Sequence, residues 1–130
     1  MDLSRMLLGT NTAKLLASWM IRKEIDITHL LMPFNNLEDD GLCELAHAIS
    51  CSKTLVVVDL AQNSITPRCA GALFKMISTN ESIVTFNVGS FRGPERNRLG
   101  REGCLAIADA FRSNFCLIQY LSLKSTSIGS

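Results

Sequence analysis

The stretch LVVVDLAQNSITPRCAGALFKMISTNESI, residues 55–83, decides the fold because its hydrophobic period changes halfway along. In its first half, apolar residues recur two apart, as at Val58 and Leu60, which is typical of a short strand. In its second half they step by four, as from Leu73 to Ile77, which is typical of one face of a helix. The stretch therefore predicts a strand, a turn and a helix, in that order.

Polar residues mark where the helical halves begin. Thr66 is suited to cap a helix, and Pro67 to take its first position, where the N–H that proline lacks is not needed. In an earlier stretch, Glu38, Asp39 and Asp40 place negative charge at the positive end of a helix. Both stretches thus predict helix starts.

The pattern recurs along the chain in one register. Its units open at four apolar residues: Ile27, Leu55, Ile83 and Ile118. The first two intervals are 28 residues each. The third unit is interrupted after Val88 and resumes at Asn97. Such self-similarity is the signature of a repeat architecture.

Stacking explains how the units fold. Neither the strand nor the helix of one unit can bury its apolar side alone, whereas adjacent units bury both. We therefore predict an α/β fold: a curved solenoid with parallel inner strands and outer helices, in a single domain of residues 1–130. It comprises about three full repeats, over 27–54, 55–82 and 83–117, a partial fourth over 118–130, and a cap helix over 12–23.

The cap helix has its own predicted pattern. Ala13, Ala17 and Ile21 take the core positions that the helices of the later units fill with larger residues or glycine. Trp19 makes this helix unlike the others, as expected for a terminal helix that closes the core.

The run from Leu55 to Ile65 resembles a leucine-rich repeat of the ribonuclease-inhibitor type, with the pattern L-x-x-L-x-L-x-x-N-x-[LI]. The resemblance covers roughly residues 12–130 and extends to the repeats of tropomodulin and of the Ran GTPase-activating protein. It implies that Asn35 and Asn63 turn inward and bond backbone groups at the strand ends, which a buried turn requires in any case. Because this repeat serves many functions, it does not select one.

Alternate residues of each strand are predicted to face the concave side of the solenoid. They are His29, Leu31 and Pro33, then Val57, Asp59 and Ala61, then Thr85, Asn87 and Gly89, and finally Tyr120, Ser122 and Lys124. A mixed surface with an aromatic ring, an acid and a base is one that protein partners use. The candidate partner-binding residues on it are His29, Leu31, Asp59, Asn87, Tyr120, Ser122 and Lys124. The alternative is that each is an ordinary solvated strand residue.

Measured against the repeat, the segment SFRGPERNRLG contains an insertion of six residues between Val88 and Asn97, which projects from one rim. Three interpretations stand: a phosphate-binding loop, an arginine supplied to a GTPase, and a loop that contacts a partner or braces its neighbours. The last is favoured, because side chains interrupt the backbone amides that a phosphate loop needs. Its candidate partner-binding residues are Arg92, Arg96 and Arg98.

Composition argues against several classes of function. The net charge is +1, so no whole-chain field favours nucleic acid or an anionic membrane. The longest apolar stretches are too short to span a bilayer, and the N-terminus lacks a secretory h-region.

The five cysteines predict buried reduced thiols, with Cys43, Cys69 and Cys104 in apolar segments, rather than disulfides or a metal site. Neither His29 nor His47 has a nucleophile and an acidic orienter at a recognisable spacing, so we expect no enzyme and no cofactor.

The sequence therefore predicts a noncatalytic protein-protein interaction module of the cytoplasm. It binds a protein partner of unknown identity through the concave strand face and the Arg-rich rim loop, and a tropomodulin-like role would associate it with the cytoskeleton. The alternative is a GTPase regulator that supplies an arginine to a partner GTPase. Because no following unit covers the apolar residues Ile118, Leu121, Leu123 and Ile128, we expect either a piece of a longer protein or self-association through this uncapped C-terminal end.

Overall fold

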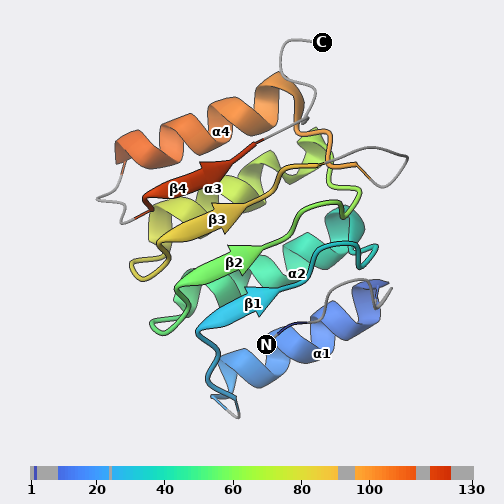
Figure 1. Ribbon diagram of the computed structural model, residues 1–130, viewed down its shortest axis with the longest axis vertical. Coiled ribbons are helices and arrows are strands. Elements are labelled where there is room, and N and C mark those ends of the chain that lie inside the picture. Colours follow the sequence, from blue (N-terminus) through green and yellow to red (C-terminus); the bar gives the residue numbers. More distant parts are fainter. Residues whose placement is uncertain (1, 3–8, 24, 91–95, 114–117, 124–130) are drawn as a thin grey trace.

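The computed structural model describes residues 2, 9–23, 25–90, 96–113 and 118–123. Within them the chain is α/β, with four α-helices and a four-stranded parallel sheet (Figure 1). The elements follow in the order α1 (Gly9–Ile21), β1 (His29–Leu31), α2 (Glu38–Cys51), β2 (Val57–Asp59), η1 (Pro67–Cys69), α3 (Ala70–Thr79), β3 (Thr85–Asn87), α4 (Gly100–Ser113) and β4 (Tyr120–Ser122).

The sheet runs in chain order, β1-β2-β3-β4, with every neighbouring pair parallel. Each strand returns to the sheet through a helix, and these helices lie side by side on one face of it (Figure 1). Pairing aligns Leu30 with Val58 and Val58 with Phe86. This middle row is fully buried between sheet and helices. The alternation of apolar and polar residues that predicts the strands therefore arises because helices cover only one face of the sheet.

The residues on either side of the buried row form what we call the open sheet face. Its members are His29, Leu31, Val57, Asp59, Thr85, Asn87, Tyr120 and Ser122. All of them are exposed or half-buried. The helices therefore leave this face available to solvent.

The helices pack through the positions that step by four. Leu45, Ile49, Leu73 and Ile77 are at most 2% exposed, as their spacing predicts. A glycine opens this series in α2 because the helix starts close to the preceding leucine: a Cβ on Gly41 would lie 3.0 Å from Leu37 Cβ. In α4, a Cβ on Gly103 would lie 2.7 Å from Leu99 Cβ, which is too short for any side chain.

The predicted start of the helix after β2 is confirmed. The Thr66 hydroxyl accepts a hydrogen bond from the Arg68 backbone N–H at 3.3 Å, and Pro67 occupies the first position of η1. At the start of α2 the three acidic residues lie in the first turn, where they favour the helix dipole. The cap residue there is Leu37, and no side chain caps this helix by a hydrogen bond.

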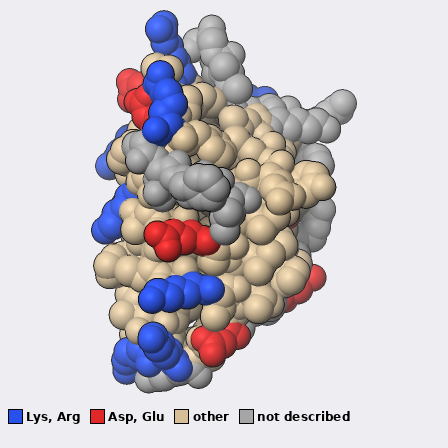
Figure 2. Space-filling view, turned by 90° about the vertical axis from the view of Figure 1, so that its left-hand side faces the viewer, with Lys and Arg blue, Asp and Glu red and all other residues tan. Residues whose placement is uncertain are grey.

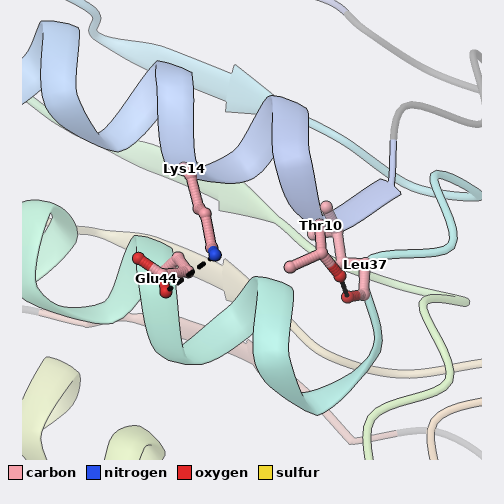
Figure 3. Close-up of polar contacts among 4 residues, drawn as sticks. All are labelled: Thr10, Lys14, Leu37 and Glu44. Atoms are coloured by element: carbon pink, nitrogen blue, oxygen red, sulfur yellow. Dashed lines mark hydrogen bonds and ion pairs between the residues drawn. The ribbon is translucent and has the colours of Figure 1, made fainter.

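The N-terminal helix is shifted from its predicted range of 12–23. It begins at Gly9, whose φ of 71° is easily adopted by glycine, and it ends at Ile21. Thr10 donates a hydrogen bond from its hydroxyl to the Leu37 carbonyl at 3.2 Å, which ties this earlier start to the first turn of α2 (Figure 3). Lys14 forms an ion pair of 4.0 Å with Glu44 beside it (Figure 3).

Two of the three core positions predicted for this helix are correct. Ala13 and Ala17 are buried, but Ile21 is 48% exposed because the helix ends there and the chain turns away at Lys23, which has a φ of 58°. Leu16 is the third buried residue of α1. Trp19, expected to close the core, is 38% exposed instead.

Adjacent units are joined by buried asparagine side chains. The Asn63 Oδ1 accepts hydrogen bonds from the backbone N–H groups of Asn35 (2.9 Å) and Leu37 (3.3 Å) in the preceding turn. Its Nδ2 donates to the carbonyl oxygens of Met32 (2.8 Å) and Ala61 (3.0 Å). One side chain thus satisfies four backbone groups in two units. The prediction that Asn63 turns inward is confirmed, and Asn35 is fully buried as well.

Asn97 makes the same set of bonds after the interruption. Its Oδ1 accepts from the N–H groups of Asn63 (2.9 Å) and Ile65 (3.0 Å). Its Nδ2 donates to the carbonyl oxygens of Leu60 (2.9 Å) and Gly89 (3.3 Å), and in addition to that of Val88 (3.0 Å). The insertion therefore leaves the asparagine series intact, with Asn97 in the place that the sequence assigns to it.

A second junction lies on the rim where the strands begin. Asn80 is 5% exposed, and its Nδ2 donates to the carbonyl oxygens of Ile49 (2.8 Å) and Ser52 (3.1 Å) in the unit before. Its Oδ1 accepts from the N–H groups of Ser82 (2.7 Å) and Ile83 (2.8 Å). Nothing in the sequence pattern singles this asparagine out.

Ser52 occupies the equivalent place one unit earlier. Its backbone has φ −68° and ψ 137°, against −72° and 135° for Asn80. The Ser52 hydroxyl accepts from the Leu55 N–H at 3.1 Å, but it lacks an amide to reach the unit before. A groove of about 310 Å³ opens beside it, lined among others by Met20 and Ile25. Ser52 is itself one of the residues that line this groove.

We expect exchange of these two residues to change stability in opposite directions. Ser52→Asn should raise the free energy of unfolding by about 0.5–1.5 kcal/mol, because the amide gains partners at a matching backbone geometry. Asn80→Ser should lower it by about 1–3 kcal/mol, because buried carbonyl groups lose their donor. Urea unfolding at pH 7 measures both, and a loss of stability in Ser52→Asn would contradict the equivalence.

Candidate functional site

The open sheet face places its residues in two rows across the four strands. One row is His29, Val57, Thr85 and Tyr120, and the other is Leu31, Asp59, Asn87 and Ser122. Six of the predicted partner-binding residues therefore lie together on one surface, and the seventh, Lys124, lies outside the described residues. Tyr120 is 66% exposed.

Two polar members of this face also hold the backbone at the strand ends. Asp59 Oδ1 accepts a hydrogen bond from the Ala61 N–H at 3.0 Å, and Asn87 Oδ1 accepts one from the Gly89 N–H at 2.9 Å. Each side chain thus turns its own backbone as the strand ends. One oxygen of each is structural, so these residues serve the fold as well as the surface.

The insertion after β3 is closed at its base. The Ser90 hydroxyl accepts from the Asn97 N–H at 2.7 Å and lies 3.3 Å from the Asn97 carbonyl, to which it donates. Arg98 follows directly, and its backbone N–H donates to the Ile65 carbonyl at 2.7 Å. The ends of the insertion are therefore fixed by buried contacts.

The predicted arginines of this region lie on the rim where the strands end. Arg98 is exposed and Arg96 is half-buried, while Arg92 falls outside the described residues. The Nε of Arg96 is buried and has no hydrogen-bond partner among the residues that the structure describes. An unpaired donor of this kind is unusual, because buried polar groups nearly always find an acceptor.

Asp39, which the sequence pattern predicts only to favour the helix dipole, is a polar centre of this rim. Its carboxylate accepts from the Thr66 N–H (2.8 Å), the Thr66 hydroxyl (2.6 Å) and the Cys69 thiol (3.0 Å) in the next unit. The sequence shows that Asp39 and Thr66 occupy helix starts one unit apart. It does not show that the two side chains are in contact across the units.

The pKa of Asp39 reflects these contacts. Burial by itself raises the pKa, but the hydrogen bonds from Cys69 and Thr66, with the nearby charge of Arg68, lower it below its ordinary value of 3.8. Burial raises the pKa of the Cys69 thiol, and the Asp39 carboxylate raises it further. Cys69 is therefore a protonated donor at neutral pH.

The expectation of buried thiols is correct only in part. Cys69 is buried, but Cys43 and Cys51 are exposed and Cys104 is half-buried. Cys43 was misjudged because its apolar neighbours Leu42 and Leu45 point to the core while it lies on the outer surface of α2. Cys116 lies outside the described residues.

Neither a metal centre nor a membrane span emerges from the described part of the chain. No group of three or more His, Cys, Asp or Glu side chains is placed there to hold a metal ion. None of the helices in this part combines the length and apolar character needed to cross a bilayer. His47 is exposed on α2, with its ring 3.9 Å from the Cys51 sulfur.

Two known proteins are similar to parts of this chain. NACHT, LRR and PYD domains-containing protein 13 of Homo sapiens is 29% identical over 87 residues, which cover 67% of this chain and 8% of that protein. RAN GTPase-activating protein 2 of Arabidopsis thaliana is 27% identical over 94 residues, which cover 72% of this chain and 16% of that protein. The chain thus spans a small part of each relative. No family model matches it.

The Asp39 contacts should make stability depend on pH. Because the pKa of Asp39 is lowered on folding, its contribution is present above the pKa of the unfolded carboxyl and is lost as pH falls through the folded pKa. We expect Asp39→Asn to lower the free energy of unfolding by about 1–3 kcal/mol at pH 7, since an amide cannot accept from all three donors.

Urea unfolding from pH 7 down to pH 3 measures this effect, with Asp40→Asn as the control of equal charge. Asp40 is exposed and adjacent to Asp39. The difference in the free energy of unfolding between wild type and Asp39→Asn should become smaller as the pH falls below about 4. If this difference does not change with pH, or if Asp40→Asn loses as much stability as Asp39→Asn, the contribution of the Asp39 hydrogen bonds is excluded.

Proposed function

We propose that the chain is a leucine-rich-repeat solenoid of the ribonuclease-inhibitor type and serves as a noncatalytic protein-interaction module. The parallel sheet with helices on one face supports the solenoid, as do the inward asparagines at equivalent places in successive units. One similar protein carries LRR in its name. The matched part covers only 8% of that protein. The activity of the whole protein, a cytoplasmic location and a role at the cytoskeleton are therefore parts of this proposal.

The observation that carries the proposal is the open sheet face. It presents two rows of side chains across all four strands, while the buried row beneath keeps them in register. Tyr120 supplies an aromatic ring, His29 and Asp59 supply polar groups, and Leu31 and Val57 supply apolar area. A rigid surface that mixes these groups is suited to a protein partner.

The rim arginines extend this surface at the ends of the strands. Arg96 directly precedes and Arg98 directly follows Asn97, which closes the base of the insertion, so the backbone beside both is fixed before any partner arrives. The open sheet face and the rim are the two contact regions of the proposed module. Self-association through the end formed by α4 and β4 is a further contact within the same proposal.

The open sheet face is tested with two long, charged substitutions. Val57→Arg with Thr85→Arg leaves the strand-end bonds of Asp59 and Asn87 in place while it obstructs the face. The control is Cys43→Arg with Leu105→Arg, which adds the same charge on exposed positions of the helices. After equal thermal stability is verified, affinity capture with mass spectrometry compares the partners of each form.

We expect a partner of the wild type to be retained by the control and lost from the strand variant, with affinity reduced at least about tenfold. Loss of the same partner from the helix variant instead would place the interaction on the outer surface. Retention by both variants would contradict the proposed use of the sheet.

A second candidate is a GTPase regulator that supplies an arginine to its partner. The similarity to RAN GTPase-activating protein 2 supports it, together with Arg98 and Arg101 exposed on one rim. An arginine of this kind stabilises charge that develops on the transferred phosphate. If a GTPase is captured, Arg98→Ala and Arg101→Ala distinguish the two functions. A regulator loses acceleration of GTP hydrolysis while it keeps binding, whereas a binding module loses affinity alone.

A further inference from the structure

Two neighbouring units bring four guanidinium groups to the strand-end rim: Arg68, Arg96, Arg98 and Arg101. The start of α4 lies against η1, since a Cβ on Gly100 would lie 3.2 Å from Pro67 Cγ. Arg101 and Arg68 are the residues that directly follow these two. The backbone bond from Arg98 to Ile65, at 2.7 Å, joins the same two units just before the helix. The four side chains, which we call the basic rim, therefore belong to one surface.

None of the four arginines of the basic rim forms an ion pair with a carboxylate of the described residues. Asp39 is the carboxylate whose pKa Arg68 helps to lower, but its oxygens already accept from Thr66 and Cys69. Like charges gathered in this way repel one another, so acceptors from outside would stabilise them.

The buried Nε of Arg96 is a second observation in the same place. It has no acceptor among the described residues, and the backbone N–H of its neighbour Asn97 is fixed by Ser90. Because this Nε is buried, it is not accessible to a partner. A carboxylate that approaches this rim would meet the exposed side chains of Arg68, Arg98 and Arg101 and their positive field.

The charge pattern around the basic rim limits what it can accept. In the preceding unit the equivalent rim is acidic, with Glu38 and Asp40 exposed. On the opposite rim, where the strands begin, basic and acidic side chains are interspersed (Figure 2). Its loops carry Lys23, Asp26, Lys53 and Glu81 among their exposed residues. A short acidic segment thus fits the basic rim, while a long polyanion that continues along it meets repulsion.

We propose that the basic rim binds an acidic segment of a partner protein, with carboxylates paired to the guanidinium groups of Arg68, Arg98 and Arg101. This inference rests on the proposed function as an interaction module and names the chemistry of the partner at its rim. Arginine suits the role because its planar fork of donors matches a carboxylate with two hydrogen bonds. The three groups chosen are exposed, so they reach a partner without rearrangement of the fold.

The test measures fluorescence anisotropy of a labelled peptide of about twelve glutamates, at about 50 mM and about 300 mM salt. The variant is Arg68→Glu with Arg98→Glu and Arg101→Glu. The matched control is Lys23→Glu with Lys53→Glu and Lys75→Glu, which makes the same change of net charge at exposed positions elsewhere. A single-stranded oligothymidylate of similar length and a polylysine peptide complete the set of probes.

We expect the wild type and the lysine variant to bind the glutamate peptide, and the arginine variant to bind it at least about tenfold more weakly. Binding should weaken at the higher salt concentration. The inference is overturned if the wild type does not bind the peptide, if both variants weaken equally, or if the oligothymidylate binds more tightly than the peptide. Polylysine binding would likewise exclude a basic recognition surface.

The same variants separate this inference from the proposed function. If a partner that depends on the open sheet face is captured equally by the arginine variant, the module stands and the basic rim has no part in it. If the glutamate peptide binds at the rim but no partner depends on the sheet, the proposed function fails while the rim chemistry holds.

Discussion

The structure depends on side-chain amides that satisfy backbone groups between units. Where each strand ends, the chain must turn inside a packed interior, and its N–H and C=O groups have no water to bond. Asn63 and Asn97 each supply two donors and an acceptor at this point, so that one residue fixes the turn of its own unit and of the unit before. An unsatisfied set of this kind would cost about 1–3 kcal/mol for each buried group.

This constraint explains where the molecule can vary. The six-residue insertion is tolerated because Ser90 and Asn97 close its base and Asn97 still reaches the preceding unit. Arginines carried at its end therefore add to the rim without disturbing the sheet. On the open sheet face, side chains alternate with the buried row that packs on the helices, so most of them are free to differ. Asp59 and Asn87 are exceptions, because each also holds the backbone at the end of its strand.

Much of this could be predicted from the sequence, because the repeat aligns residues that meet in space. The rows of the sheet and the inward asparagines follow directly from the register. Contacts that depend on how far neighbouring helices approach could not be read in this way. Asp39 was interpreted through its own helix alone, while its partners Thr66 and Cys69 lie in the next unit. Ile21 and Cys43 were misplaced because the end and the rotation of a helix are set by packing.

The most direct test of the account is native-state hydrogen exchange of the four amides that donate to asparagine Oδ1 atoms: Asn35, Leu37, Asn63 and Ile65. All four lie in turns, where amides ordinarily exchange through small local openings. If the asparagines join the units, these amides should exchange only through global unfolding, with the same denaturant dependence as the core of α2 and α3. Exchange through low-energy openings that do not respond to denaturant would contradict the central role of these side chains.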